Sequence, residues 1–563
     1  MNKFLGIASM IILFQAAITA QWSGDSTQNN PICKAIDDQT NPLIVSDGNG
    51  GGIIIWIDNR NSNGNIYAQR IDENGSVLWT NNGISVSIAS NDKDQIHAVS
   101  DGNSGALIVW TDRRNGGSSN TDIYAQRIDA NGNQLWTANG VAVCKELKNQ
   151  LNPQIIEDGS NGAIIVWGDN RNSTTNGSDI YAQRISSGGN ILWQTNGNII
   201  CDNVFAQVSP KIEFVDDDTT GVIIFWEDNR NASNGTDIYA QRISLNGTAL
   251  WEPNGKSLIT AQGNQRFIET VSSLTDEIAF SWEDSGIPAN DKDIHLQVIN
   301  KYGTLKWTNT NFTNRTGSQV SQKIASDGNG NIFLTYRDLK YSVNWISVQK
   351  IDSNGNIVWA DTGIVVSKLA VEPYVLSDGF GNAIVIFEDG RNPSLDDDIY
   401  ASKLDANGNF LWNPNGVPVS TVLNNQGNFS AIKDNSGGAI IVWEDDRTDT
   451  SDIYASRLFS TGNLTSFSEE TIYGEMDFVL NQNYPNPFNP ATTISFSLSE
   501  RSSVSLKIFD ILGNEIVTLV NEIKDAGEYE VKFDAAGLSS GIYFYKIEAG
   551  GNFRDVKKMT LLK

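Results

Sequence analysis

The sequence contains few of the residues that build common catalytic and metal sites. It has two histidines, His97 and His295, and three cysteines, Cys33, Cys144 and Cys201. The cysteines share one repeated context, as in NGVAVCKE, so we expect small buried residues and no disulfide framework. A zinc site or a histidine-based triad is poorly supplied. No GxSxG, HExxH, P-loop or EF-hand pattern occurs, so the sequence predicts no catalytic residue and no cofactor.

Positive charge is also scarce. The chain has 40 Lys and Arg residues against 66 Asp and Glu, a formal net charge of -26. Such a field repels phosphate backbones and anionic lipids, so nucleic-acid binding is disfavoured. Beyond the N-terminus no apolar run is long enough to span a membrane. No amphipathic helical pattern of useful length is visible, whereas abundant Gly, Asn and Asp favour turn-rich β structure.

Residues 1–20 have the pattern of a secretory signal peptide. Lys3 gives a positive start, residues 4–17 are mostly apolar, and cleavage is expected between Ala20 and Gln21. The alternative, a buried N-terminal helix, fits less well because the following segment has a β pattern.

One strand pattern recurs eight times at spacings of 51 to 59 residues. The copies are IIIWID (53–58), LIVWTD (107–112), IIVWGD (164–169), IIFWED (223–228), AFSWED (279–284), FLTYRD (333–338), IVIFED (384–389) and IIVWED (440–445). A polar loop, a second strand such as DIYAQRID (122–129), an Asn-Gly or similar turn and usually a Leu-Trp strand follow. About four strands in roughly 55 residues are typical of a β-propeller blade.

The two ends of the repeat region complement each other. After the expected cleavage the chain begins QWSGDSTQNNPICKA, which matches LWTANGVAVCKE from the middle of a repeat. The last copy stops before its own Leu-Trp strand. A ring closed by an N-terminal strand predicts this offset, because closure removes exposed sheet edges. We therefore predict an all-β chain with an eight-bladed propeller over residues 21–464 and a linker over 465–477.

The repeated Asp and Arg residues allow two interpretations. Asp ends all eight copies, and six are followed by an arginine: Arg60, Arg114, Arg171, Arg230, Arg391 and Arg447. The arginines could form a ring that binds carboxylated or sulfated glycans. Alternatively, each pairs with an Asp of its own blade, such as Asp122 or Asp179. Recurrence in most blades favours the structural interpretation, and the recurrent Trp and Tyr are expected to pack between blades.

The fifth and sixth copies depart most from the repeat. His295 replaces the usual Tyr, Ser347 does so in the next copy, and Tyr341 and Trp345 enter the loop. Two aromatics in a polar loop could stack on a sugar ring; simple decay of the repeat is the alternative. The candidate ligand-binding residues are thus the six arginines with Tyr341, Trp345 and His295. His97 lies in a predicted strand and is expected to be structural.

Two acidic runs, 216–218 and 396–398, could hold structural calcium through carboxylate oxygens. They lack EF-hand spacing and resemble solvated turns, so no metal residue is assigned.

The last part of the chain has a different pattern, with about seven short strands expected in a small immunoglobulin-like β-sandwich. It contains YPNPFNP (484–490), KIFDILGNEI (507–516), AGEYEV (526–531), GLSSGIYFYKI (537–547) and KKMTLLK (557–563). On these motifs, residues 478–563 resemble the type A C-terminal sorting domain of the type IX (Por) secretion system of Bacteroidetes. The motif positions include Tyr484, Pro485, Asn486, Pro487, Gly541, Tyr543, Lys557 and Lys558.

The resemblance implies periplasmic transit, passage through an outer-membrane type IX translocon, and removal of the domain by a sortase. The protein would then be secreted or held on the outer cell surface; an ordinary adhesive sandwich domain is the alternative. For the propeller we predict a non-catalytic ligand-binding role, with glycans or another surface component as the ligand. A polysaccharide hydrolase or lyase using Glu283 or Asp284, and a structural surface-layer component, are the alternatives.

Overall fold

The computed structural model describes residues 22–563 with the exception of 117–119, 175–176, 216–220, 275, 287–290, 309, 314–316, 340–343, 393–395, 449, 466–478, 481, 484, 499–501, 525–526 and 550–552. The chain divides into two compact units, Met1–Ser466 and Phe467–Lys563. All regular elements among the described residues are strands, so the all-β prediction is confirmed. No described helix is long and apolar enough to cross a membrane.

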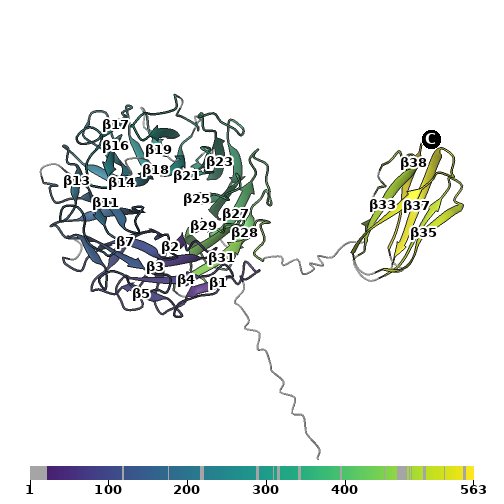
Figure 1. Ribbon diagram of the computed structural model, residues 1–563, viewed down its shortest axis with the longest axis horizontal. Helices are drawn as coiled ribbons and strands as arrows, with labels where there is room; N and C mark the ends of the chain where they lie inside the picture. The colour runs from purple at the N-terminus through teal and green to yellow at the C-terminus, as the bar shows by residue number, and fades with distance from the viewer. Residues whose placement is uncertain are drawn as a thin grey trace, which may run out of the picture. The chain divides into compact units, whose positions relative to one another are not determined.

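The described part of the first unit forms eight antiparallel sheets, which we number by the copy of the repeat that each contains (Figure 1). The innermost strands are β2 (Gln39–Ser46), β6 (Lys93–Ser100), β10 (Gln150–Glu157), β14 (Gln207–Val215), β18 (Gln265–Leu274), β21 (Gln319–Ser326), β25 (Ala370–Ser377) and β29 (Gln426–Lys433). The second strands, which carry the repeated motif, are β3 (Gly52–Asp58), β7 (Ala106–Asp112), β11 (Ala163–Asp169), β15 (Gly221–Asp228), β19 (Glu277–Asp284), β22 (Ile332–Asp338), β26 (Ala383–Asp389) and β30 (Ala439–Asp445).

The third strands are β4 (Asn65–Ile71), β8 (Asp122–Ile128), β12 (Asp179–Ile185), β16 (Asp237–Ser244), β20 (Asp293–Asn300), β23 (Trp345–Ile351), β27 (Asp398–Leu404) and β31 (Asp452–Leu458). The outer strands are β5 (Ile84–Ser87), β9 (Val141–Cys144), β13 (Asn198–Cys201), β17 (Lys256–Ile259), β24 (Ile364–Ser367), β28 (Val417–Ser420) and, in sheet 8, β1 (Asn30–Cys33). Strand β1 pairs with β31, Asn30 opposite Ala455.

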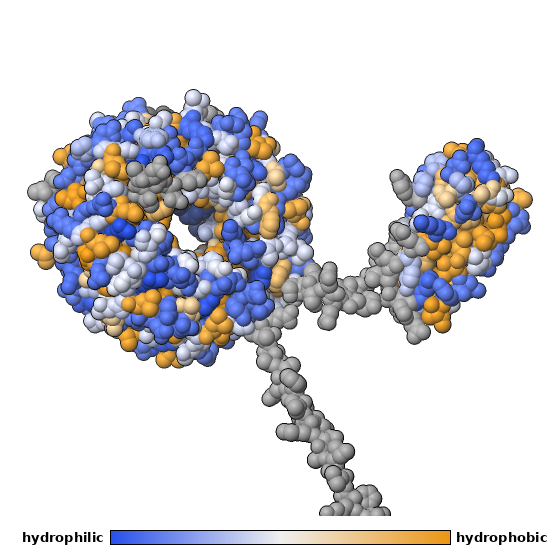
Figure 2. Space-filling view, viewed as in Figure 1, coloured by the Kyte–Doolittle hydropathy of each residue, from blue (hydrophilic) through white to orange (hydrophobic). Residues whose placement is uncertain are grey.

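Neighbouring sheets pack face to face around a central opening, which Figure 2 shows as a hole through the first unit. Each innermost strand contacts the next, and β29 contacts β2. The second strands are buried on both sides, which explains their continuous apolar runs: every residue of β11 is buried. The core is therefore divided among the interfaces between sheets, and one cluster joins Trp22 and Ile32 of sheet 8 to Ile44 and Trp56 of sheet 1.

The second unit has two sheets. One orders β32 (Val479–Leu480), β33 (Ala491–Leu498) and β36 (Gly527–Asp534); the other orders β35 (Glu515–Lys524), β34 (Ser502–Phe509), β37 (Gly541–Ala549) and β38 (Phe553–Leu561). Both contribute to one core, which includes Phe496 of β33 and Tyr545 of β37.

The proline-rich motif of this unit is joined to its last strand. Thr560 donates its backbone N–H to Asn486 Oδ1 at 2.9 Å, and Phe488 donates its own to the carbonyl of Thr560 at 3.0 Å. The hydroxyl of Tyr543, another motif residue, donates to the carbonyl of Ser539. The sequence motifs thus connect the two ends of the unit; Tyr484 lies outside the described residues, as do Ala20 and Gln21.

Candidate functional site

The repeated arginines are paired inside their own sheets. In sheet 3, Arg171 Nε donates to Asp169 Oδ1 at 2.9 Å and Nη2 to Oδ2 at 2.6 Å, while Trp167 Nε1 donates to Oδ2 at 2.9 Å. Asp169 is fully buried. Although burial opposes it, the hydrogen bonds with Asp169 raise the pKa of Arg171 above its ordinary value. The Asp169–Arg171 ion pair is therefore made within sheet 3.

The same arginine also joins two sheets. Its guanidinium carbon lies 3.9 Å from the ring centre of Tyr181, and Nη2 donates to the carbonyl of Asn196 and contacts Cys144 Sγ of sheet 2 at 3.2 Å. We call this group of Trp, Asp, Arg and Tyr the fastening set. The same Asp–Arg pairing holds Arg60, Arg114, Arg230, Arg391 and Arg447.

One detail of the sequence interpretation was wrong. The carboxylate partner of each arginine is the Asp two residues before it, and not the Asp that begins the third strand. Asp122 and Asp179 instead accept hydrogen bonds from Asn115 and Asn172.

The recurrent tryptophans pack between sheets as expected, but the hydrogen bonds that they make to the next sheet were not predicted from the sequence. Trp136 Nε1 of sheet 2 donates to the carbonyl of Ser187 in sheet 3 at 2.9 Å, and Arg127 of the same sheet pairs with Asp101 at 2.8 Å. Between sheets 8 and 1, Trp22 Nε1 and Arg457 Nη1 both donate to the carbonyl of Glu73. The sequence signal for these contacts was the Asp-Gly pair that recurs before the motif strand and the Gln-Arg pair that recurs in strands such as DIYAQRID.

Sheet 5 lacks the arginine of the fastening set. Gly286 occupies its position, and Trp282 Nε1 is buried without a partner among the described residues. His295 stacks on Trp282 with ring centres 5.3 Å apart and shares a hydrogen bond with Thr310 Oγ1. Burial lowers the pKa of His295. His295 therefore fills the place of the repeat Tyr in the packing.

The innermost strands contribute one residue each, at a shared register position, to the central opening. These are Leu43, His97, Gln154, Lys211, Glu269, Lys323, Tyr374 and Ser430. His97 shares a hydrogen bond with Gln154 at 3.0 Å, while Glu269 pairs with both Lys211 and Lys323. Although burial opposes it, these two lysines lower the pKa of Glu269. Charge is thus concentrated where sheets 4, 5 and 6 meet.

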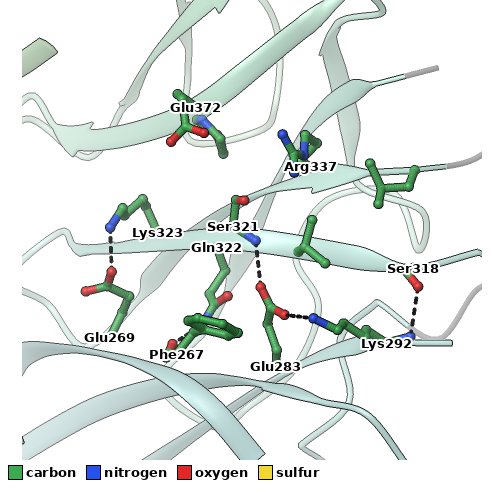
Figure 3. Close-up of a pocket in the computed structure, with 13 residues that line it drawn as sticks. Phe267, Glu269, Glu283, Lys292, Ser318, Ser321, Gln322, Lys323, Arg337 and Glu372 are labelled. Carbon is green, nitrogen blue, oxygen red and sulfur yellow. Dashed lines mark hydrogen bonds and ion pairs between the residues drawn. The ribbon is translucent and has the colours of Figure 1, made fainter. Parts of the chain in front are cut away.

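A pocket of about 540 Å³ opens beside this charged group, between sheets 5, 6 and 7 (Figure 3). We call it the mouth pocket. Its charged residues are Glu269, Glu283, Lys292, Lys323, Arg337 and Glu372. Glu283 Oε2 pairs with Lys292 at 2.8 Å, and Oε1 accepts the backbone N–H of Ser321 at 2.9 Å. Both oxygens of the predicted Glu283 are therefore occupied by protein donors, whereas Asp284 is not among the lining residues.

Arg337 is the unusual member of the mouth pocket. Sheets 4, 5, 7 and 8 carry Glu at this position, and Glu388, for example, accepts the backbone N–H of Asn428 from the next sheet. Arginine cannot accept this bond. Its Nε is buried and has no hydrogen-bond partner in the described part of the chain. The reversal from Glu to Arg was visible in the copy FLTYRD, but the sequence analysis did not use it.

Phe267 is the second unusual residue. Its φ of 58° lies in the left-handed region, where a bulky side chain is unfavourable. The corresponding residues of the other innermost strands are Asn41, Gln95, Asn152, Ser209, Ser321, Glu372 and Asn428, all polar. Phe267 is 58% exposed, with Lys292 Nζ 5.5 Å from its ring centre. It therefore presents an aromatic face to the mouth pocket without gaining burial.

The remaining predicted residues fall elsewhere. Trp345 and Arg391 line another pocket, between sheets 6 and 7, while Tyr341 lies outside the described residues. The acidic run 216–218 also lies outside them. In the run 396–398, Asp396 Oδ2 accepts the backbone N–H of Asn424 at 3.1 Å.

Residues 482–561 match the family described as Secretion system C-terminal sorting domain, which confirms the resemblance found in the sequence. The C-terminal part of the chain belongs to this family. The protein is accordingly exported to the outer cell surface or secreted, and its tail implies an interaction with the type IX secretion machinery.

No curated protein matches the chain. Among solved structures, an ulvan lyase from a new polysaccharide lyase family is 12% identical, covering 78% of this chain and 98% of its own, with a TM-score of 0.40. The Penicillium chrysogenum α-L-arabinanase complexed with arabinobiose is 11% identical over 56% of this chain and 94% of its own, with a TM-score of 0.33. These likenesses carry no argument about a ligand or a reaction.

Proposed function

We propose that residues 21–464 form an eight-bladed propeller, closed by β1, that is exported to bind an anionic glycan at the mouth pocket. The observation that carries the ligand proposal is Arg337, a cation with a buried donor that no described protein group accepts. The closure proposal rests on the pairing of β1 with β31 and on the Trp22 hydrogen bond to Glu73.

Three acidic and three basic residues line the mouth pocket, and their pairing leaves Arg337 and the exposed Glu372. Arg337 is the cation that an anion can reach. Lys292 is paired with Glu283, and Lys323 with Glu269. Arg337 has no such pairing among the described residues, although the chain as a whole has a formal charge of -26. A carboxylate or sulfate matches the planar fork of donors that arginine presents.

The aromatic residue favours a sugar as the carrier of that anion. An exposed ring can stack on the apolar face of a pyranose while neighbouring polar groups bind its substituents. A left-handed backbone at a residue other than glycine costs about 1–2 kcal/mol. All eight innermost strands share this conformation, so the strain belongs to the repeat, and the exposed aromatic ring is what distinguishes Phe267.

The test uses the full chain and isothermal titration calorimetry with trigalacturonate, a sulfated carrageenan tetrasaccharide and uncharged maltotriose. We expect an acidic probe to bind and maltotriose to fail. Arg337→Gln should weaken binding about 10- to 100-fold, since hydrogen bonds to charged groups contribute roughly 1.5–3 kcal/mol. The matched control is Arg113→Gln in sheet 2, because Arg113 Nε is likewise buried without a partner but its guanidinium pairs with Asp94. Equal affinity in Arg337→Gln and wild type would contradict the proposal.

Incubating the full chain with the same probes and assaying for products separates binding from catalysis and from a surface-layer role. Product release from a probe that stops in Glu372→Gln or Glu283→Gln would replace the binding role by a hydrolase or lyase. Glu372 is the more direct test, because it is exposed and Glu283 already holds two protein donors. An absence of both binding and turnover would favour a surface-layer role.

The proposed domain boundaries, a linker at 465–477 and a sorting domain at 478–563, have their own test. Deleting residues 478–563 should leave the remaining chain in the periplasm. If the truncated protein reached the cell surface, the tail would not be the export signal.

A further inference from the structure

A second pocket, of about 610 Å³, lies between sheets 6 and 7 and is separate from the mouth pocket in its lining residues. We call it the seam pocket. Trp345, at the start of β23, forms one part of it, and Lys368 and Arg391 supply its positive charge. Lys368 Nζ lies 5.2 Å from the centre of the Trp345 ring.

At the regular interfaces an asparagine closes this region. Asn196, with φ of 64°, accepts the backbone N–H of Lys145 from the preceding sheet on its side-chain oxygen at 3.2 Å. Asn139 and Asn254 do the same for Ile88 and Asp202.

The interface between sheets 6 and 7 differs. The corresponding Asn415 is not among the residues with positive φ, and it donates its own N–H to Asn413 Oδ1 at 2.9 Å. Among the described residues no hydrogen bond joins Asn415 to Lys368. The hydrogen bond that joins sheets 1 and 2, sheets 2 and 3, and sheets 3 and 4 is therefore missing where the pocket opens.

The arginine at this interface is also more accessible. The Arg391 side chain is 31% exposed, against 12–18% for the other five arginines of the fastening set. It still pairs with Asp389, so it does not contribute a free charge. Lys368 is exposed and is the cation available to a ligand.

The third change is Trp345 itself. Six sheets begin their third strand with Asp and sheet 1 with Asn, whereas sheet 6 begins it with a half-buried Trp. An aromatic side chain, a turn without the asparagine bond and a half-buried arginine thus meet in one pocket.

We propose that the seam pocket is a second binding site for an acidic sugar, independent of the mouth pocket. The indole of Trp345 stacks on the pyranose ring, and Lys368 binds its carboxylate or sulfate. The Asp389–Arg391 pair forms the polar wall beside it. The site shares a ligand class with the proposed function but none of its residues.

The experiment measures the number of trigalacturonate molecules bound per full chain by calorimetry. Wild type is expected to bind two, and Trp345→Ala and Lys368→Met one each. Trp345→Phe, which keeps an aromatic face, should retain the second site with reduced affinity. Lys368→Met keeps the test valid if Trp345→Ala fails to fold, because Lys368 is exposed.

Combining these changes with Arg337→Gln distinguishes the two sites. The double variant Arg337→Gln, Lys368→Met should bind none. If Arg337→Gln binds like wild type while Lys368→Met loses one site, the mouth-pocket proposal fails and the seam pocket stands. Unchanged stoichiometry in both Trp345→Ala and Lys368→Met, or no binding of the probe to wild type, would overturn the seam-pocket proposal.

Discussion

Sheets 3 and 6 contain the same strand order but use arginine in opposite ways. In sheet 3, Arg171 is held by Asp169, stacks on Tyr181 and joins the neighbouring sheet. In sheet 6, Arg337 replaces a glutamate that elsewhere accepts a backbone bond, and its Nε has no described acceptor. The comparison teaches that residue type alone does not mark a binding site in a repeat protein. A polar group that recurs with its partner stabilises the sheets, whereas Arg337 appears once without a described partner and is the cation that we propose binds a ligand.

Breaking the fastening set should have the largest effect. Asp169→Ala leaves Arg171 and Trp167 Nε1 buried without their acceptor, and losing one partner of a buried pair costs about 3–5 kcal/mol. Asp284→Ala in sheet 5 is the matched control, because Asp284 ends the same motif in a sheet that lacks the arginine. Asp284 accepts the backbone N–H of Gly286. Its expected cost is about 1 kcal/mol. Urea unfolding of both variants measures the difference; equal losses would contradict the role given to the arginine.

Substitution of Trp22, which packs between sheets 8 and 1, should have the next largest effect on stability. Trp22→Ala removes a buried side chain and its hydrogen bond to Glu73, and Trp→Ala changes in cores cost about 3–5 kcal/mol. Trp22→Phe keeps much of the packing and loses only the bond, about 1 kcal/mol. Thermal unfolding should therefore rank wild type, Phe and Ala in that order. A Trp22→Ala protein as stable as wild type would mean that the N-terminal segment does not hold the ring closed.

Restoring the missing arginine of sheet 5 should have a smaller effect and should raise the stability. A Cβ at Gly286 meets nothing within 4 Å, and its φ is not positive, so Gly286→Arg is sterically allowed. The new guanidinium can pair with Asp284, as in the regular sheets, and should raise stability by about 1 kcal/mol. Gly286→Ala is the control for the lost glycine alone. If Gly286→Arg melts at no higher a temperature than Gly286→Ala, the ion pair with Asp284 requires other residues of the repeat that sheet 5 lacks.

The effect of Lys93 depends on pH, and this residue occupies a position where six innermost strands begin with Gln. Burial lowers its pKa from 10.5 to about 8. The unfolded chain therefore binds the proton more readily, so this residue opposes folding below pH 8 and ceases to do so above pH 10.5. Lys93→Gln should be more stable than wild type at pH 7, with the advantage shrinking toward pH 10.5. An advantage independent of pH would point to packing as its cause.

Much of the scaffold could be predicted because the same strand pattern recurs eight times in the sequence. The strand order within a sheet follows from period-two patterns and turns, and the match of QWSGDSTQNNPICKA to mid-repeat sequence anticipated the pairing of β1 with β31. The identity of the arginine partner could not be chosen, because Asp169 and Asp179 lie opposite each other in the paired strands β11 and β12 and both are near Arg171.

The candidate pockets were harder to predict for a physical reason. The mouth pocket is built from residues of three sheets that lie up to about a hundred positions apart, such as Phe267 and Glu372. Their proximity depends on how the sheets pack, which no local pattern encodes. The sequence analysis did turn to the irregular fifth and sixth copies, which line the mouth pocket, but it favoured aromatic residues over the single substitution of Glu by Arg337.

The most direct test of the account compares Arg171→Gln with Arg337→Gln in two measurements, urea unfolding and calorimetric binding of trigalacturonate. Arg171→Gln should lose about 3–5 kcal/mol of unfolding free energy and, where folded, bind the probe at the mouth pocket with wild-type affinity. Arg337→Gln should keep its stability to within about 1 kcal/mol and lose at least about tenfold in affinity. The reverse pattern, or equal effects of both changes on both measurements, would contradict the division between fastening and binding arginines.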